Sequence, residues 1–263
     1  MQIVILKNAE QASKLAAAYI AAEIRKNPKI VLGLATGSTP IRMYKELIRL
    51  YKEEGLDFSQ VKSFNLDEYY GLSPEHPASY RYFMNEQLFD HINIDKANTH
   101  VPNGLAKDIE ASCAEYEAAI KAAGGVDIQV LGIGSDGHIG FNEPATSLSA
   151  RTHGQTLMLG TRKDNARLFF DGKLDEVPTR AVTMGTGTIL ESRTAILLAF
   201  GKGKAPAIAG AVEGAISHMN QASALQMHRN AIFIVDEDAA SMLKNVDFYK
   251  AVYADSDLRK LEK

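Results

Sequence analysis

The feature that most constrains the fold is the alternation of short apolar, β-branched runs with longer helical patterns along the chain. Most of these runs are continuously apolar, which is typical of parallel strands buried on both faces. The recurring order of strand and helix predicts an α/β fold: an open, doubly wound, mostly parallel sheet with helices on both faces. We expect strands at Gln2–Leu6, Ile30–Leu34, Val61–Leu66, Ile128–Ile133, Thr194–Phe200 and Ala231–Val235.

Helix boundaries are marked between these runs. A polar side chain that can accept from the first free backbone N–H groups favours a helix start, and proline favours the first helical position. Glycine, or asparagine followed by proline, favours a helix end. We therefore expect starts at Asn8 with Gln11, at Thr39 with Pro40, at Asp108 and at Asp236 (before a helix over 237–244), and ends at Asn27-Pro28, Gly55 and Gly124-Gly125.

The length of 263 residues suits one α/β domain, since such domains often reach about 250 residues. No repeat or Pro/Ser-rich linker divides the chain. We predict a single domain over residues 1–263, in which 245–263 is a C-terminal tail. The one cysteine, Cys113, excludes an internal disulfide and a Cys-based zinc site, and its place in a helical run predicts packing.

Charge and hydropathy exclude several classes of partner. The net charge of −3 and the pI near 6.2 provide no electrostatic reason to bind nucleic acid or an anionic membrane. The longest apolar stretches fall far short of the ~18 residues of a spanning helix. The N-terminus also lacks the pattern of a signal peptide. We expect a soluble, cytoplasmic protein that binds a small molecule, with no nucleic-acid or membrane partner.

The segment after the second expected strand is a candidate anion site, because ligands of open α/β sheets bind beyond the carboxyl ends of the strands. Small residues let backbone N–H groups approach an anion, and a following helix N-terminus adds positive potential. No Gly-Lys-Ser/Thr follows, so the segment is not a Walker A loop. The alternative is an ordinary turn with a threonine cap. The residues concerned are Thr36, Gly37, Ser38 and Thr39.

Two acids, Asp67 and Glu68, stand at the end of the third expected strand. Successive strand residues point to opposite faces, so at most one of the two is expected to face the crevice. A carboxylate there can serve as a general base if its surroundings set its pKa. The alternative is a solvated acid at a strand end.

A glycine-rich loop follows the fourth expected strand. Gly132-x-Gly134-x-x-Gly137 matches a dinucleotide-binding spacing, but the following "HIGFNEP" is no helix start. Leu157 stands where the ribose-binding acid belongs, so we expect no dinucleotide cofactor.

The same loop carries Asp136, His138 and Glu143, which could converge because glycines allow tight turns. Carboxylates can orient and tune an imidazole for proton transfer near neutral pH. The set could also bind a divalent metal, although no second histidine lies at helical spacing. A polar loop with locally satisfied groups is the third interpretation. We expect no metal.

Basic residues complete the candidate set. Arg162, Lys163 and Arg167 lie on an expected helix before "LFF", and Lys202 and Lys204 follow the fifth expected strand. Arginine can clamp a phosphate with two hydrogen bonds, and lysine supplies a point charge. Each of them could instead be a solvated surface residue. Lys204 is the best placed, because it follows a sheet strand and adjoins a helix start.

Three motifs carry a resemblance to a known family: "LATGSTP", "FNLDEYYGL" with "HPASY" after it, and "GIGSDGHIGFNEP". Together they resemble the glucosamine-6-phosphate deaminases. Further similar segments are "NARLFF", "AVTMGTGTIL", "AVEG" and "HRNAIFIVDE". The resemblance runs from the first expected strand to about residue 245, and the Asp-Gly-His-Ile-Gly-Phe-Asn-Glu-Pro run is its most specific part.

The resemblance implies a modified Rossmann-like fold and a hydrolase that needs no redox cofactor. Glucosamine 6-phosphate and water would give fructose 6-phosphate and ammonia, by aldose–ketose isomerisation coupled to deamination. Members of the family occur both as small and as hexameric assemblies, so a homo-oligomer stays open.

The resemblance also implies roles for the candidate residues. Asp67 would take a proton from C2 of the opened sugar and return one at C1. His138 would open the pyranose ring, assisted by Asp136 and Glu143. The Thr36–Thr39 loop, Arg167 and Lys204 would hold the 6-phosphate.

One departure from the family concerns its activator. Members that are activated by N-acetylglucosamine 6-phosphate carry an Arg-x-Lys pair after the Asn-Glu-Pro loop. This chain has His153-x-Gln155 there, and Thr146 where activated members have serine. A neutral or weakly basic pair binds a second phosphate poorly, so we expect weak or absent activation.

Three other functions stay open. A 6-phosphogluconolactonase shares the broader family fold but would not need Asp67 as a carbon base. A non-catalytic sugar-phosphate sensor would need neither Asp67 nor the Asp136–His138–Glu143 set. A metal-dependent hydrolase using His138 and carboxylates would lose its activity on exhaustive chelation.

Overall fold

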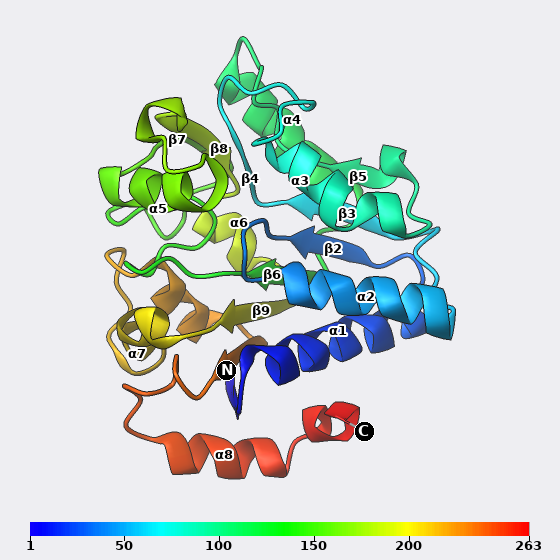
Figure 1. Cartoon of the computed structure of the whole chain (residues 1–263), viewed down its shortest axis with the longest axis vertical. Coiled ribbons are helices and arrows are strands. Elements are labelled where there is room, and N and C mark those ends of the chain that lie inside the picture. Colours follow the sequence, from blue (N-terminus) through cyan, green and yellow to red (C-terminus); the bar gives the residue numbers. More distant parts are fainter. Residues whose placement is uncertain (263) are drawn as a thin grey trace.

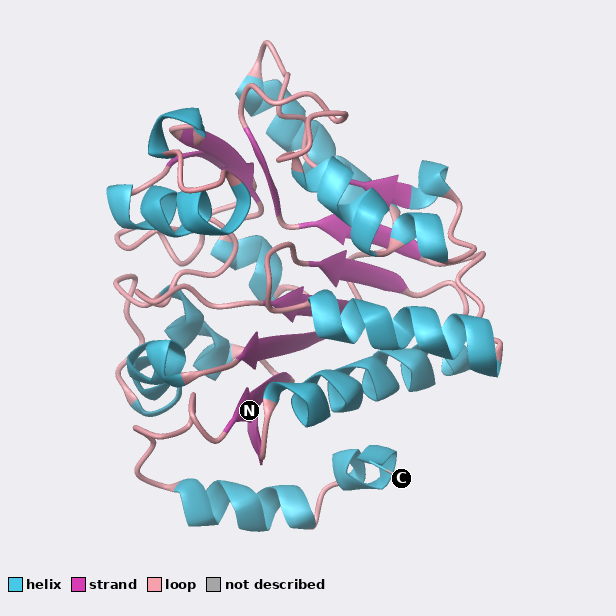
Figure 2. Cartoon of the chain, in the orientation of Figure 1, coloured by secondary structure: helices cyan, strands magenta, loops and turns pink. Residues whose placement is uncertain are grey.

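The chain folds around a seven-stranded sheet, with a smaller three-stranded sheet beside it. The structure is a computed structural model, and it describes residues 1–262. All strands of the large sheet pair in parallel, in the order β1-β10-β9-β6-β2-β3-β5 (Figures 1 and 2). These strands are β1 Gln2–Leu6, β2 Val31–Leu34, β3 Lys62–Asn65, β5 Thr99–His100, β6 Ile128–Leu131, β9 Thr194–Ala199 and β10 Ala231–Asp236. The predicted fold class and all six predicted strands are confirmed; β5 was not predicted.

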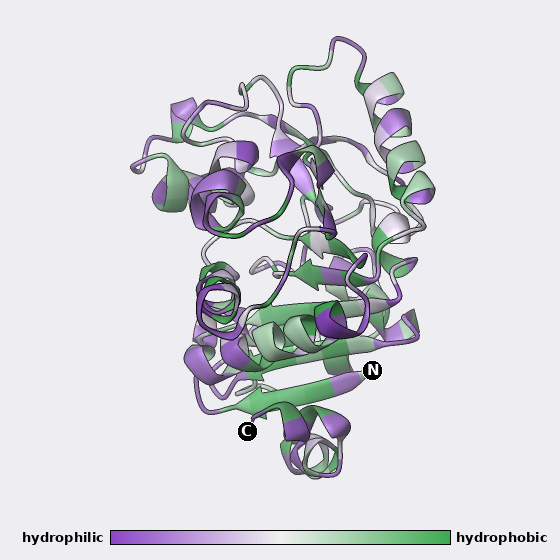
Figure 3. Cartoon of the chain, turned by 90° about the vertical axis from the view of Figure 1, so that its right-hand side faces the viewer, coloured by the Kyte–Doolittle hydropathy of each residue, from purple (hydrophilic) through white to green (hydrophobic). Residues whose placement is uncertain are grey.

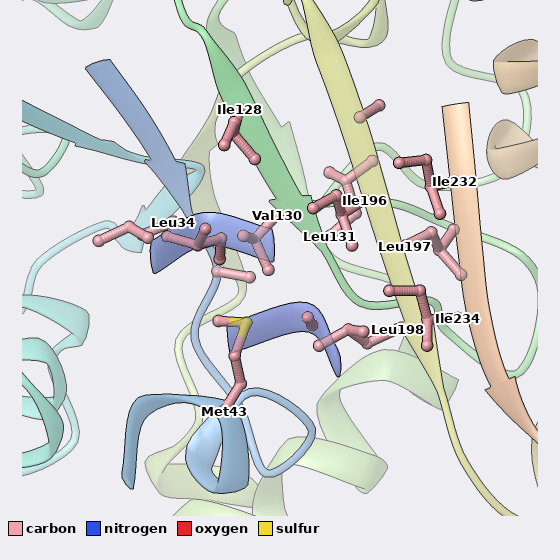
Figure 4. Close-up of a cluster of buried hydrophobic side chains, with 14 of the residues drawn as sticks. Leu34, Met43, Ile128, Val130, Leu131, Ile196, Leu197, Leu198, Ile232 and Ile234 are labelled. Atoms are coloured by element: carbon pink, nitrogen blue, oxygen red, sulfur yellow. The ribbon is translucent and has the colours of Figure 1, made fainter. Parts of the chain in front are cut away.

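Helices flank the sheet and bury the strands. The strands of the large sheet are predominantly hydrophobic, whereas the helices show mixed faces (Figure 3). Apolar side chains of β2, β6, β9 and β10 pack together in the core, and Met43 packs there from α2 (Figure 4). The α-helices are α1 Ala9–Lys26, α2 Ile41–Glu54, α3 Tyr80–Gln87, α4 Ile109–Ala122, α5 Leu159–Phe169, α6 Thr186–Leu190, α7 Ala205–Glu213 and α8 Val246–Ala254. Short 3-10 helices are η1 Phe89–His91, η2 Lys96–Asn98, η3 Leu174–Glu176, η4 Lys202–Lys204, η5 Gln221–Met227 and η6 Asp257–Glu262.

The small sheet was not predicted. It is antiparallel in the order β4-β8-β7, with β4 Asp67–Tyr69, β8 Arg180–Thr183 and β7 His153–Thr156. The chain changes sheets at Leu66, whose N–H donates to Leu34 and whose carbonyl accepts from the Met184 N–H. The expectation that Asp67 and Glu68 end the parallel strand is therefore wrong. The strands β4, β7 and β8 are short and, unlike most of the predicted strands, do not lie in continuous apolar runs.

Most predicted helix boundaries are confirmed. Asn8 accepts from the Gln11 N–H at 3.0 Å, and Asp108 accepts from the Ala111 N–H at 3.0 Å. Gly55 ends α2 with a φ of 67°, in the left-handed region that favours glycine. The C-terminal tail packs on its own chain over residues 245–262, because α8 contacts β1 and η6 contacts α1. Residue 263 lies outside the described residues.

Two boundaries are corrected. The helix α2 begins at Ile41 after Pro40, without a side-chain cap from Thr39. Asp236 does accept from the Ala239 N–H at 2.8 Å, but residues 237–242 form turns and not the expected helix. Both Asp236 carboxylate oxygens also accept from the Gly201 N–H, so this side chain ties the ends of β9 and β10 together.

Gly33 in β2 leads to a stability prediction, because it pairs with Gln129 of β6 in the sheet register. A Cβ added at Gly33 would lie 2.0 Å from Oε1 of Gln129, whose side chain is fully buried. We expect Gly33→Ala to lower the free energy of unfolding by about 1–3 kcal/mol through overpacking. Urea unfolding followed by circular dichroism measures this, with Gly160→Ala as control, since no atom lies within 4 Å of that added Cβ. An unchanged urea midpoint for Gly33→Ala would contradict the prediction.

Candidate active site

The site lies where the order of the large sheet reverses. From β2 the chain continues outward to β3 and β5, and it then returns to β6 on the other side of β2. The loops after β2 and β6 therefore diverge and leave a crevice at the carboxyl ends of the strands. In Figure 1 the arrowheads of these strands point to the side on which α5 and α7 lie. A cavity of about 270 Å³ lies there.

This cavity brings together residues that are far apart in the sequence. The loop after β2, the loop after β6, the first residue of β4, the helix α5 and the turn η4 all contribute to its lining. Of the predicted site residues, Thr36, Gly37, Ser38, Thr39, Asp67, His138, Arg167 and Lys204 line it. Asp136 and Glu143 do not line it, but the carboxylates of both approach Nδ1 of His138.

A larger cavity, of about 1040 Å³, lies between α4 and β7. Its central acid, Glu117, accepts from the hydroxyls of Thr152 and Thr188 at 2.6 Å each and pairs with Arg151. None of the buried polar atoms that lack a partner in residues 1–262 belongs to its lining residues. The smaller cavity is therefore the candidate active site.

Asp67 is a buried carboxylic acid at the start of β4, with 5 % of its surface exposed. Burial raises its pKa well above the ordinary value, and the charge of Glu68 raises it further. Glu68 points the other way and accepts from the N–H groups of Tyr69, Tyr80 and Arg81 at 2.8–3.0 Å. It thereby holds the N-terminus of α3. The prediction that only one of the two acids faces the crevice is confirmed.

The three ionisable groups of the glycine-rich loop converge on the His138 ring. Its Nδ1 lies 2.7 Å from Oδ1 of Asp136 and 3.9 Å from Oε2 of Glu143. Burial acts to raise the pKa of Asp136, but the hydrogen bonds from the His138 ring and from the His138 backbone N–H lower this pKa below the ordinary value. Glu143 is 2 % exposed; its Oε1 accepts from the Met158 N–H, and its Oε2 has no hydrogen-bond partner within residues 1–262. The predicted convergence is confirmed.

Glycine is required in this loop by contact with the site itself. A Cβ added at Gly134 would lie 2.3 Å from Nδ1 of His138 and 2.7 Å from Oδ1 of Asp136. The ligand atoms of Asp136, His138 and Glu143 lie within 4.8 Å of one another, so they could also hold a divalent cation. The geometry is compatible with both proton transfer and metal binding.

The other end of the cavity is suited to an anion. Gly37, with a φ of 102°, lies in the loop before the N-terminus of α2. Lys204 donates from Nζ to the carbonyl of Ile133 at 2.6 Å, and burial lowers its pKa. The side chain of Arg167 is 75 % exposed and pairs with Asp164 at 3.4 Å. The Thr36–Thr39 loop and the cationic side chains of Arg167 and Lys204 thus line the cavity. A loop before a helix N-terminus can direct backbone N–H groups toward an anion.

Residues with no predicted role also line the cavity, among them Tyr80, Thr161 and Asn165. Tyr80 is buried and packs against Tyr69 and Phe141. Thr161 and Asn165 are four residues apart on α5, so a helical period is the only signal that could have linked them.

An α/β fold whose post-strand loops place a buried carboxylate, a histidine–carboxylate cluster and an anion pocket around one cavity defines a class of enzymes that act on small phosphorylated sugars. The family model described as glucosamine-6-phosphate isomerases/6-phosphogluconolactonase matches residues 7–235. The chain belongs to this family.

Individual relatives agree with this assignment. A protein of Clostridium perfringens named glucosamine-6-phosphate deaminase is 54 % identical over 244 residues, which is 93 % of this chain and 100 % of that protein. A protein of the same name from Shewanella woodyi is 54 % identical over 257 residues, covering 97 % and 96 %.

Solved structures show the same fold. A monomeric glucosamine-6-phosphate deaminase superposes with a TM-score of 0.89 at 45 % identity, covering 92 % of this chain and 100 % of that one. A 6-phosphogluconolactonase from Trypanosoma cruzi superposes with a TM-score of 0.70 at 22 % identity, covering 92 % and 97 %. The latter likeness shows the fold alone.

Proposed function

We propose that the chain is a glucosamine-6-phosphate deaminase of amino-sugar catabolism, converting glucosamine 6-phosphate and water to fructose 6-phosphate and ammonia. The observation that carries the proposal is the presence of the buried Asp67 carboxylate, the His138 cluster and the anion pocket in one cavity. The names of the relatives support it. Water enters and a C–N bond breaks, so the net reaction is a hydrolysis.

Asp67 supplies the base for the isomerisation. It removes the C2 proton of the opened sugar. The released electron pair forms a C1–C2 double bond as the C1 carbonyl π bond breaks, and O1 takes up a proton, which gives an enolamine. The conjugate acid of Asp67 then protonates C1 while the nitrogen lone pair forms a C2–N double bond, which leaves an iminium at C2. Water adds to C2 and ammonia leaves. A buried carboxylate with a raised pKa is a stronger base than a solvated one, which favours the first proton transfer.

His138 opens the ring before this step. A neutral imidazole can move a proton from the anomeric hydroxyl to the ring oxygen, which breaks the C1–O5 bond. Asp136 and Glu143 lie on the Nδ1 side of the ring, so they hold it in one orientation and favour one tautomer.

The anion pocket anchors the substrate. Backbone N–H groups of Thr36–Thr39, the ammonium group of Lys204 and the guanidinium group of Arg167 bind the 6-phosphate. Binding energy from this remote group positions C1 and C2 against Asp67 and His138.

We further propose that residues 1–263 form one catalytic domain and that the protein acts in the cytoplasm, alone or as a homo-oligomer. Within residues 1–262, no helix combines the length and the apolarity that a membrane crossing requires.

A lactonase is the second candidate, since the family includes 6-phosphogluconolactonases and their structures share the fold. Lactone hydrolysis moves no proton at C2. Ammonia release from glucosamine 6-phosphate, with deuterium from D₂O appearing at C1 of the product, supports the deaminase. Hydrolysis of 6-phosphogluconolactone without ammonia release would overturn it. Both assays are run with and without EDTA, which tests the metal-dependent alternative.

The acid limb of the pH profile is one prediction of this mechanism. The base must be ionised, and burial raises the pKa of Asp67. We therefore expect kcat/KM to rise with pH along a limb that lies well above the ordinary aspartate value of 3.8. Steady-state ammonia release between about pH 4 and 9 measures it, with phosphate affinity over the same range as control. A limb at or below pH 4 would argue against Asp67 as the base.

The absence of activation is a second prediction. His153 Nε2 lies 3.1 Å from Oε1 of Gln155, and the hydroxyl of Thr146 donates to the same oxygen at 3.3 Å. These side chains are engaged with one another and include no permanent cation for a second phosphate. We expect a hyperbolic substrate curve that N-acetylglucosamine 6-phosphate leaves unchanged. A sigmoidal curve that becomes hyperbolic on adding this compound would refute the prediction.

A further inference from the structure

One face of α5 presents two polar side chains to the cavity. Thr161 and Asn165 are one helical turn apart, and both line the cavity that contains Asp67 and His138. Thr161 is 6 % exposed and Asn165 is 9 % exposed. The neighbouring Lys163 is exposed and does not line the cavity. At these two positions, α5 therefore places polar side chains on its buried side, next to the cavity.

Neither side chain has a partner within residues 1–262. The hydroxyl oxygen of Thr161 and the amide nitrogen of Asn165 are buried and make no hydrogen bond. A threonine in a helix usually donates back to a carbonyl one turn earlier, and Thr161 does not. Buried polar groups are almost always hydrogen-bonded, because an unpaired group loses its bonds to water on folding. A ligand in the cavity is the partner that both groups lack.

The position of the pair suggests which part of a sugar phosphate it meets. Thr161 and Asn165 lie on the same helix as Arg167, and all three line the cavity that contains Asp67 and His138. Asp67 and His138 mark the reacting end. In an open-chain aldose 6-phosphate, the hydroxyls of C3 and C4 lie between the reacting C1–C2 unit and the phosphate. Both are hydroxyls that can donate and accept hydrogen bonds.

We propose that Thr161 and Asn165 are substrate-binding and specificity-determining residues, which bind the C3 and C4 hydroxyls of the open-chain sugar phosphate. The proposal rests on the proposed function for the identity of the substrate. A site built to pair with a hydroxyl rejects an analogue without it, because its own polar group is then left unpaired. The two residues thus select sugars that carry hydroxyls at both central carbons.

The first test measures binding without turnover. Sorbitol 6-phosphate, an acyclic polyol phosphate, and inorganic phosphate are titrated into wild type, Thr161→Val and Asn165→Leu by calorimetry. We expect each variant to bind sorbitol 6-phosphate about tenfold more weakly, while inorganic phosphate binds as in wild type. Thr161→Ser should restore wild-type affinity. Lys163→Ala on the outer face of α5 and Thr156→Val on exposed β7 should bind both ligands as wild type does.

Two outcomes overturn the proposal. Equal weakening of both ligands would mean that the variants displace α5 and Arg167, and unchanged affinity for sorbitol 6-phosphate would mean that the pair contacts no hydroxyl. Thermal unfolding without ligand checks folding, and we expect no decrease, since each variant removes an unpaired buried group.

The second test uses turnover to assign the hydroxyls. On glucosamine 6-phosphate, kcat/KM should fall about tenfold in each variant, and this loss should vanish on the 3-deoxy or the 4-deoxy analogue that lacks the partner hydroxyl. A loss of the same size on every analogue would contradict the assignment. If wild type releases no ammonia yet binds sorbitol 6-phosphate through the pair, the proposed function fails and the hydroxyl-binding role stands.

Discussion

Replacing Asp67 by asparagine is expected to lower kcat for ammonia release by about 10³–10⁴-fold while leaving the affinity for inorganic phosphate unchanged. The amide cannot accept the C2 proton, although it keeps the size and shape of the carboxyl group. The residues proposed to bind phosphate belong to other elements of the cavity, so the variant should still bind the anion. Single-turnover ammonia release and phosphate calorimetry measure the two effects, with Asp175→Asn at an exposed position as control.

The same variant should be more stable than wild type at neutral pH. The folded-state pKa of Asp67 is raised by burial, so the folded protein binds a proton more tightly than the unfolded chain does. The contribution of Asp67 to stability is therefore present at low pH and is lost as the pH rises through its raised folded-state pKa. The amide of the variant never carries the buried charge. We expect a higher thermal midpoint for the variant at pH 7.5 and no difference at about pH 3. Lower stability of the variant at pH 7.5 would show that burial of the Asp67 charge does not destabilise the folded protein. Turnover near that of wild type would show that Asp67 is not the base.

Replacing His138 by glutamine is expected to lower kcat/KM for glucosamine 6-phosphate by about 10²–10³-fold. Glutamine fills similar space but cannot move a proton between the anomeric hydroxyl and the ring oxygen. The loss should be large only for substrates whose sugar ring must first open, because Asp67 and the anion pocket remain in place. The 4,5-dideoxy analogue has neither the C4 nor the C5 hydroxyl and closes to neither a furanose nor a pyranose, so the variant should process it with a much smaller loss relative to wild type.

A second variant tests whether ring opening depends on the position of the His138 imidazole. Gly134→Ala introduces a Cβ within 2.3 Å of the His138 ring and should displace it without removing its titratable group. Its losses should follow the same pattern, larger for the pyranose than for the 4,5-dideoxy analogue. Equal losses on both substrates in His138→Gln would assign His138 to a later step.

Local sequence patterns predicted a large share of the site. The alternation of strand residues separated Asp67 from Glu68, because side chains one residue apart in a strand leave on opposite faces. The glycines between Asp136 and Glu143 predicted their convergence on His138, since the three groups are close in sequence and only the loop has to turn. Caps at Asn8 and Asp108 were predictable for the same reason: each bond spans three residues.

Long-range placement was not predictable from these patterns. The helix expected after Asp236 is replaced by turns. The Asp236 carboxylate also accepts from the N–H of Gly201, thirty-five residues away, a contact that no local pattern indicates. Arg167 was predicted from its motif, but its exposure and its pairing with Asp164 follow from where α5 lies. Thr161 lies in none of the quoted motifs, and Asn165 begins the "NARLFF" segment without a role assigned to it. The importance of both depends on the absence of any partner within residues 1–262.

The sequence by itself determined the α/β class, the positions of six strands of the large sheet and the chemical groups at the site, because burial on both strand faces and short-range turn geometry leave a direct record in residue order. Only the tertiary structure decided that β2 and β6 are neighbours and that β4 leaves the large sheet at Leu66. Strand order and sheet exchange depend on pairing between segments tens of residues apart. That pairing opens the crevice and brings Asp67, the Thr36–Thr39 loop and residues of α5 to the same cavity.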